Sequence, residues 1–164
     1  MKVVFDSNIY ISAFAIPGGL AGQALDAAMD GAFQVAVSRP ILDEVLGILA
    51  RKFARDGEEL ARVALLVSSL AEMVKPSHRI DLLADEPDNR ILECAIAAKA
   101  DVIVTGDRGM LALGACEGIP ILSLREFLDA LGPARSAHEP RPAYKAPKRK
   151  GVASTSSSIA RSRP

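Results

Sequence analysis

Residues 2–8 read Lys-Val-Val-Phe-Asp-Ser-Asn, and the fold of the chain is predicted outward from this opening stretch. The apolar run that ends at Phe5 predicts a buried strand of a parallel sheet, and the polar residues after it predict a turn into a helix. Residues 102–105, Val-Ile-Val-Thr, predict a second buried strand, which Gly106 and Asp107 end. Each of these two strands therefore runs directly into an aspartate.

Helix and strand patterns alternate through the rest of residues 1–132. Ser38 followed by Pro40 is typical of a helix start, and Gly132 is typical of a helix end. Apolar residues between 58 and 74 recur at the spacing of an amphipathic helix, which we expect to lie on the sheet. This alternation predicts an α/β fold with a parallel sheet. We predict strands over 33–37 and 119–122, and helices over 21–29, from 40 towards 55, over 58–74, from the 85–88 segment through 99, and from 123 to 132.

Charge is distributed unevenly along the chain, although the formal net charge is zero over 164 residues. Residues 133–164 contain eight Lys or Arg against Glu139 alone, five prolines and a Ser/Thr run, so they carry +7 while residues 1–132 carry −7. A segment of this composition buries too little apolar surface to offset its loss of chain entropy. We therefore predict a folded domain over 1–132 and a disordered basic tail over 133–164.

The few cysteines and histidines of the chain exclude two kinds of structure. Only two cysteines, Cys94 and Cys116, and two histidines are present, and their spacing is not that of a metal site. A Cys/His zinc site and a disulfide scaffold are therefore excluded. We expect both thiols to be free, as in a reducing compartment. No apolar run approaches the roughly 18 residues of a membrane helix, and the short apolar run before Asp6 leads us to expect no secretion signal. We expect a cytoplasmic protein with no membrane association.

Four carboxylates are candidates for a single site. In parallel sheets ligands bind beyond the carboxyl ends of the strands, where Asp6 and Asp107 lie. Taken singly, each of these two also fits an ordinary turn or helix cap. Glu44 lies beside the apolar face of its helix, whereas its neighbour Asp43 faces outward. Asp88 is either the N-cap of the following helix or a carboxylate held at the same end as the others.

Convergence of these carboxylates would call for a cation. Two like charges about 4 Å apart cost roughly 4 kcal/mol at an effective dielectric of about 20. Oxygen ligands without His or Cys select a hard ion such as Mg²⁺ or Mn²⁺, which keeps waters that serve as nucleophiles in phosphate chemistry. The sequence therefore predicts a metal site, provided that the four side chains meet.

Four segments, taken in order, resemble the motifs of the PIN domain family. They are residues 4–8 (Val-Phe-Asp-Ser-Asn), 38–46 (Ser-Arg-Pro-Ile-Leu-Asp-Glu-Val-Leu), 85–92 (Asp-Glu-Pro-Asp-Asn-Arg-Ile-Leu) and 104–107 (Val-Thr-Gly-Asp). The resemblance covers about residues 3–128. It points to the bacterial branch that comprises VapC-like ribonucleases, the toxin components of toxin–antitoxin systems.

This resemblance implies a three-layer α/β/α fold with a parallel central sheet, and a metal-dependent endoribonuclease that uses Mg²⁺ or Mn²⁺. The implied site residues are Asp6, Glu44, Asp88 and Asp107, with Asn8 and Thr105 in support. Asp85 remains an alternative third acid, because the acidic residues are doubled in this segment. The implied partners are an RNA substrate, a cognate antitoxin and a second copy of the chain in a homodimer.

Two other functions remain open. A haloacid-dehalogenase-like phosphatase needs a second Asp two residues after its nucleophile, and Asn8 stands at that position. A PIN-like fold that only binds RNA or a protein, without cleaving, is separated from a nuclease by metal-dependent activity. For an RNA-binding chain, we expect the basic tail or a dimer groove to supply the phosphate contacts that the acidic domain lacks.

Overall fold

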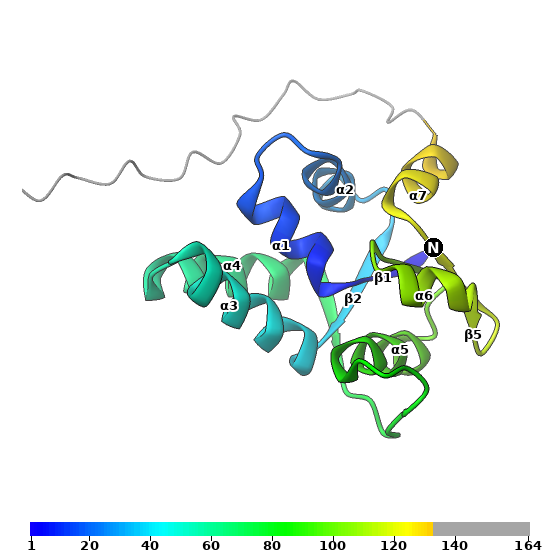
Figure 1. Cartoon of the computed structure of the whole chain (residues 1–164). Helices are drawn as coiled ribbons and strands as arrows, with labels where there is room; N and C mark the ends of the chain where they lie inside the picture. Colours follow the sequence, from blue (N-terminus) through cyan, green and yellow to red (C-terminus); the bar gives the residue numbers. More distant parts are fainter. Residues whose placement is uncertain (133–164) are drawn as a thin grey trace, which may run out of the picture.

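The computed structural model describes residues 1–132, which form a six-stranded sheet enclosed by helices (Figure 1). The strands lie in the order β3-β2-β1-β4-β6-β5, with parallel pairing throughout except between β6 and β5. The predicted α/β fold with a parallel central sheet is therefore confirmed. The strands are β1 (Lys2–Phe5), β2 (Gln34–Ser38), β3 (Ala71–Val74), β4 (Val102–Val104), β5 (Ala115–Cys116) and β6 (Ile119–Leu122).

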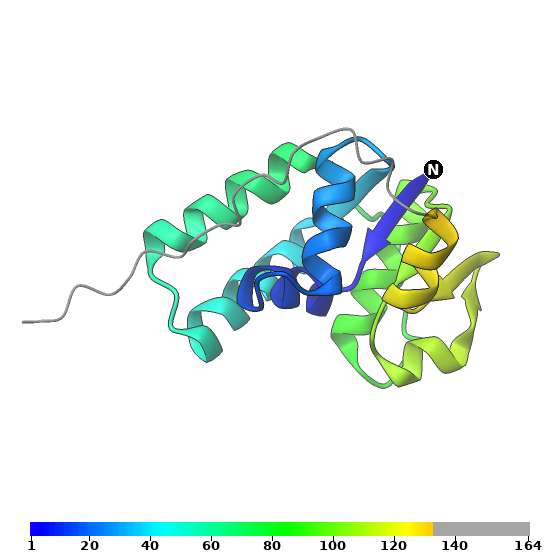
Figure 2. The same cartoon turned by 90° about the horizontal axis from the view of Figure 1, so that it is seen from above.

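Helices cover both faces of the sheet, as the three-layer prediction requires. On one face α5 packs across β1, β2, β3 and β4, while α1, α2 and α7 lie on the other, where α2 contacts both α1 and α7. α3 contacts β2, α1 and α5, and α4 lies alongside α3 (Figure 2). The helices are α1 (Ser7–Ala15), α2 (Leu20–Met29), α3 (Arg39–Phe53), α4 (Gly57–Leu70), α5 (Glu86–Ala98), α6 (Arg108–Leu113) and α7 (Leu124–Leu131).

An aromatic cluster holds the central strand β1 to the helices on one face. Phe5 meets Tyr10, Phe33 and Phe127 edge-on, with ring centroids 5.8, 5.9 and 6.1 Å apart. Phe33 and Phe127 also meet edge-on at 5.0 Å. Such pairs contribute about 0.5–1.5 kcal/mol each beyond the burial of their area. The cluster joins β1, α1, the residue directly before β2 and α7, and so fixes where β1 ends.

One predicted helix was too long. The helix predicted over 58–74 is α4, which ends four residues earlier, and Ala71–Val74 form the edge strand β3. The apolar spacing of the helix continues through these residues, while Glu72 and Met73 are exposed and give β3 no apolar alternation. The prediction that this helix lies on the sheet holds at the edge of the sheet, where α4 contacts β3. α4 also packs on α3, and Val67 is its one buried residue.

The other predicted elements are confirmed to within a few residues, and two short ones were not predicted. These are α6, which has Asp107 as its N-cap, and the two-residue strand β5. Cys94 and Cys116 are buried and unpaired, as expected. Burial raises the pKa of Cys94 to about 12, so its thiol is not a nucleophile near neutral pH.

The helix α7 closes the described part of the chain and is capped at both ends, with Gly132 at its end as predicted. The Ser123 hydroxyl accepts from the N–H of Glu126, whose carboxylate accepts from the N–H of Ser123, and Gly132 at φ +79° ends the helix. The predicted basic tail, 133–164, lies outside the described residues. None of the helices in residues 1–132 is long and apolar enough to cross a membrane.

Candidate active site

The carboxyl ends of β1 and β4 form the edge at which the candidate residues gather. β2 and β3 follow β1 along the chain and extend the sheet on one side of β1. The chain then returns, and β4 pairs with the other side of β1. In open parallel sheets a crevice for ligands forms outside the strand ends at such a reversal. The N–H of Asp6 donates to the carbonyl of Val104 at 2.9 Å, so the ends of β1 and β4 are in direct contact.

Asp6 is held through both of its carboxylate oxygens. Oδ1 accepts from the N–H of Asn8 at 3.1 Å, which caps α1, and Oδ2 accepts from the Thr105 hydroxyl at 2.6 Å. Burial raises the pKa of Asp6, the two hydrogen bonds lower it, and the charges of Asp107 and Asp85 raise it further. Asn8 is exposed, so the support predicted for it comes from its backbone. Asp6 is thus a buried and fixed acid.

Thr105 joins Asp6 to Asp107. Its hydroxyl is fully buried, donates to Asp6 and accepts from the N–H of Asp107 at 2.9 Å. Asp107 caps α6, because its Oδ1 accepts from the N–H of Met110 at 2.9 Å. The aspartates that follow β1 and β4 are therefore linked through one hydroxyl.

Glu44 is oriented by Ser7, a residue that the sequence did not single out as functional. Ser7 is 2% exposed, and its hydroxyl donates to Oε2 of Glu44 at 2.5 Å, which joins α1 to α3. The one signal in the sequence was a hydroxyl residue directly after a strand-ending aspartate, a pattern that turns also produce. The neighbouring Asp43 is exposed and paired with Arg39 at 2.7 Å, which confirms its predicted place on the surface.

Asp88 is the acid whose pKa the neighbouring carboxylates raise. It lies in the first turn of α5, but the N-cap of this helix is Asp85, so the prediction of Asp88 as a cap is wrong. Burial, reinforced by the like charges of four neighbouring carboxylates, raises the pKa of Asp88 to about 6. The four, in order of decreasing effect, are Asp107, Asp6, Asp85 and Glu44. The structure therefore brings the other three predicted acids, and the alternative Asp85, into electrostatic range of Asp88.

Comparison with known proteins identifies the family. The sequence profile of the PIN domain matches residues 2–109. The chain belongs to the PIN domain family. The uncharacterized protein MJ1680 of Methanocaldococcus jannaschii is 30% identical to this chain over 117 residues, which span 69% of this chain and 75% of that protein.

A solved structure shows the same fold. It is the crystal structure of VapBC2 from Rickettsia felis bound to a DNA fragment from their promoter. The match has a TM-score of 0.55 at 17% identity and covers 75% of this chain and 98% of the other. At this identity the likeness concerns the PIN fold, in which a mostly parallel sheet carries helices on both faces.

PIN domains are typically nucleases, and PIN nucleases generally use divalent metal ions. Within residues 1–132, no three Asp, Glu, His or Cys side chains are close enough together to enclose an ion as they stand. The chemistry of the donor set fits a hard cation, since every candidate ligand is a carboxylate oxygen. No ion pair in this part of the chain neutralises Asp6, Glu44, Asp88 or Asp107. A cation at this edge would relieve the repulsion that raises the pKa of Asp88.

Proposed function

We propose that this PIN domain is a Mg²⁺- or Mn²⁺-dependent endoribonuclease and the toxin component of a toxin–antitoxin pair. The observation that carries the proposal is the gathering of carboxylates around Asp88, where the strand order reverses and no basic side chain of residues 1–132 pairs with them. Membership of the PIN domain family supports nuclease chemistry. The fold likeness to the VapBC2 structure supports the toxin–antitoxin setting.

The residues that would hold the ion are Asp6, Glu44, Asp88 and Asp107, with Asp85 as the alternative third acid. A bound Mg²⁺ or Mn²⁺ supplies a Lewis acid for the phosphodiester and an activated water as the nucleophile. The contribution of the chain itself is positioning. Thr105 and the N–H of Asn8 fix the carboxylate of Asp6, and Ser7 fixes that of Glu44. These hydrogen bonds hold Asp6 and Glu44 in place, while the acids as a group must move closer together to enclose an ion.

The sequence after Asp6 argues against the phosphatase alternative. That mechanism needs a nucleophilic carboxylate and a second Asp, two residues later, as the general acid. The general acid is missing, since Asn8 occupies its position. Water activated by a cation requires neither group.

The proposed partners are a cognate antitoxin and a second copy of the chain, and the proposed compartment is the cytoplasm. The antitoxin follows from the fold likeness to the VapBC2 structure. Purification of the tagged chain from its native host tests both partners. A small companion protein that copurifies in constant ratio with a dimer of the chain is the expected result.

The nuclease proposal is tested by incubating a mixed-sequence single-stranded RNA with the full chain and Mg²⁺ or Mn²⁺. We expect cleavage that EDTA abolishes and that Asp6→Asn and Asp107→Asn abolish. Asp43→Asn is the matched control, because Asp43 is exposed, paired with Arg39 and next to Glu44 in the chain. Cleavage that survives both substitutions would come from a contaminating ribonuclease. Metal binding without cleavage of any RNA would favour the silent binding module.

A further inference from the structure

The loop before α5, residues 79–85, is fixed by buried polar side chains of that helix. Asn89 is 2% exposed, and its Oδ1 accepts from two loop N–H groups at 3.1 and 2.8 Å while its Nδ2 donates to the carbonyl of Leu83 at 2.7 Å. Glu93 is 6% exposed and accepts from the N–H of Ile80 at 2.6 Å. An exposed loop held in this way presents a defined surface.

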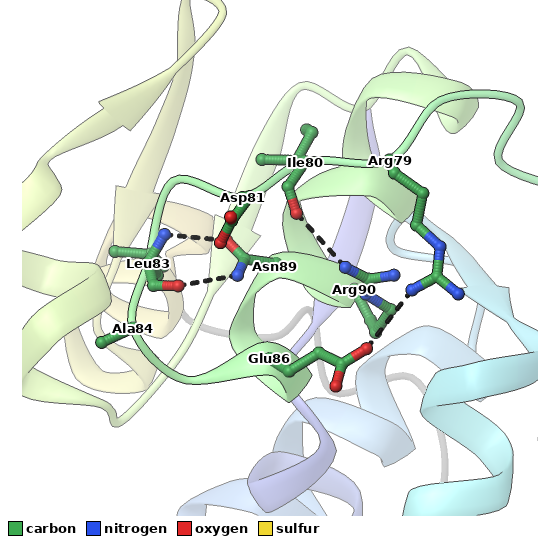
Figure 3. Close-up of a pocket in the computed structure, with 8 residues that line it drawn as sticks. All are labelled: Arg79, Ile80, Asp81, Leu83, Ala84, Glu86, Asn89 and Arg90. Carbon is green, nitrogen blue, oxygen red and sulfur yellow. Dashed lines mark hydrogen bonds and ion pairs between the residues drawn. The ribbon is translucent and has the colours of Figure 1, made fainter.

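Between this loop and α5 lies a pocket of about 340 Å³ (Figure 3). Such a volume is at the lower end of the range of about 300–1,000 Å³ found for small-molecule sites. Ile80, Leu83 and Ala84 contribute its apolar surface. Figure 3 shows the guanidinium of Arg79 facing the carboxylate of Glu86 across part of the pocket. The pocket is therefore of a size for one flat group and combines apolar and polar walls.

Both arginines that line the pocket are already paired. The largely buried side chain of Arg90 forms an ion pair with the buried Glu93 at 3.1 Å, and Arg90 also donates to the carbonyl of Ile80 at 3.2 Å. Arg79 and Glu86, both exposed, form an ion pair at 3.3 Å. Because no cation is in excess, a phosphate group gains little here. A nucleobase suits the pocket better, since bases stack on guanidinium planes and their amino groups donate to carboxylates.

The pocket adjoins the candidate active site. Ala84 and Glu86 line the pocket, and Asp85 between them contributes its charge to the acidic cluster around Asp88. Glu86 and Asp88 themselves are two residues apart on α5, so their side chains point to different faces of the helix. An RNA strand whose phosphodiester lies at the acidic cluster therefore has a nucleotide within reach of the pocket.

We propose that this pocket binds one nucleobase of the RNA substrate and thereby determines the sequence at which the strand is cut. The inference rests on the proposed ribonuclease function and names a specificity subsite for it. Arg79 is the residue that stacks on the base, because its ion pair with Glu86 is exposed, contributes little and is readily exchanged. Arg90 is committed to the loop and to Glu93.

The test compares Arg79→Ala and Arg79→Lys with the wild type and with Arg125→Ala, a control at an exposed arginine of α7. The full chain is incubated with Mn²⁺ and a pool of RNAs of randomised sequence, and the cut positions are sequenced. Binding of single sequences from the pool is measured with the same substitutions in an Asp6→Asn background. We expect the wild type to prefer one base at a fixed distance from the cut, and both Arg79 variants to lose at least about fivefold of that preference. Arg125→Ala should keep it.

Each other outcome has a distinct meaning. Arg79→Lys that retains the preference while Arg79→Ala loses it would overturn base stacking, because a charge at position 79 would then be enough to select the base. Full preference in both variants would overturn the subsite and leave the nuclease proposal standing. A wild type that neither binds nor cuts RNA would overturn both proposals. Thermal unfolding is measured in parallel, and the Tm of each variant should match that of the wild type because Arg79 is exposed.

Discussion

Two carboxylates on α5, at positions 88 and 93, occupy opposite electrostatic environments. Glu93 is 6% exposed, lies 3.1 Å from the guanidinium of Arg90 and accepts a hydrogen bond from the N–H of Ile80. Asp88 is less buried, yet it has no ion pair within the described residues, and like charges surround it.

Glu93 therefore stabilises the fold, whereas the ionised form of Asp88 lowers the stability of the native state. Burial of a charge is tolerated when a counter-charge and hydrogen bonds accompany it, which is the situation of Glu93. Asp88 lacks that compensation, so its environment is complementary to a positive charge that residues 1–132 do not supply. The two residues therefore make opposite predictions for stability and for the response to metal ions.

Replacement of Glu93 has the largest expected effect. Glu93→Gln leaves the buried guanidinium of Arg90 without its counter-charge, and breaking a buried pair costs about 3–5 kcal/mol. We expect denaturant titration to show a free energy of unfolding lower by about 3 kcal/mol. The double variant that adds Arg90→Met removes the stranded charge and should recover most of the loss. A single variant as stable as the wild type would show that this pair does not maintain the loop.

Metal ions should affect the two positions differently. A ligand that binds the native state alone, at about 100 times its Kd, stabilises that state by about 2.7 kcal/mol. We expect Mg²⁺ or Mn²⁺ to raise the Tm of the wild type by this mechanism and to have little effect on Asp88→Asn or Asp6→Asn. Glu93→Gln should start from a lower Tm and still gain the full increment. An equal increment in the wild type and Asp88→Asn would remove Asp88 from the metal site.

The strand ends, and with them part of the site, were predictable from the sequence. Asp6 and Asp107 each follow a buried apolar run, and neighbouring parallel strands place their carboxyl ends together whatever the details of the side chains. The position of Asp43 on the surface followed from the helical period. Family resemblance, rather than periodicity, put Glu44 and Asp88 in the same site.

The contacts that orient these acids were not predictable. The hydrogen bond between Ser7 and Glu44 joins positions 37 residues apart, and Asn89 and Glu93 are polar residues within the apolar period of a helix. A period shows which face of an element is buried, but it does not show which partner a buried polar group finds. The edge strand β3 was missed for a related reason, because its exposed residues follow no apolar pattern.

Removal of the Ser7 hydroxyl should weaken metal binding by an intermediate amount. Residues that orient metal ligands typically change metal affinity or activity about 10–100-fold when they are replaced. We expect Ser7→Ala to raise the Kd for Mn²⁺ about tenfold, measured by the metal-induced rise in Tm over a concentration series. Ser7→Thr keeps the hydroxyl and should retain most of the affinity. Asn8→Ala is the neighbouring control, because the bond from Asn8 to Asp6 comes from its backbone. Equal affinities in all variants would leave Ser7 a structural role alone.

Asp88→Asn in metal-free buffer has the smallest expected effect, and its sign is opposite to that of Glu93→Gln. The pKa of Asp88 is raised from 3.8 to about 6, so between these values the native state holds a proton that the unfolded chain has released. The free energy of unfolding contributed by this group therefore falls as the pH rises through that window. Above it, the ionised side chain costs the native state about 1 kcal/mol once solvent screening is included.

Denaturant titrations in EDTA at several pH values measure this cost as the difference between Asp88→Asn and the wild type. We expect the variant to be more stable by about 1 kcal/mol near pH 7 and the difference to vanish near pH 4, where both side chains are neutral. Asp43→Asn is the surface control, because Asp43 already has Arg39 as its counter-charge. A difference that stays constant with pH would arise from packing rather than from charge. In that case the acidic cluster would carry no electrostatic cost for a cation to relieve.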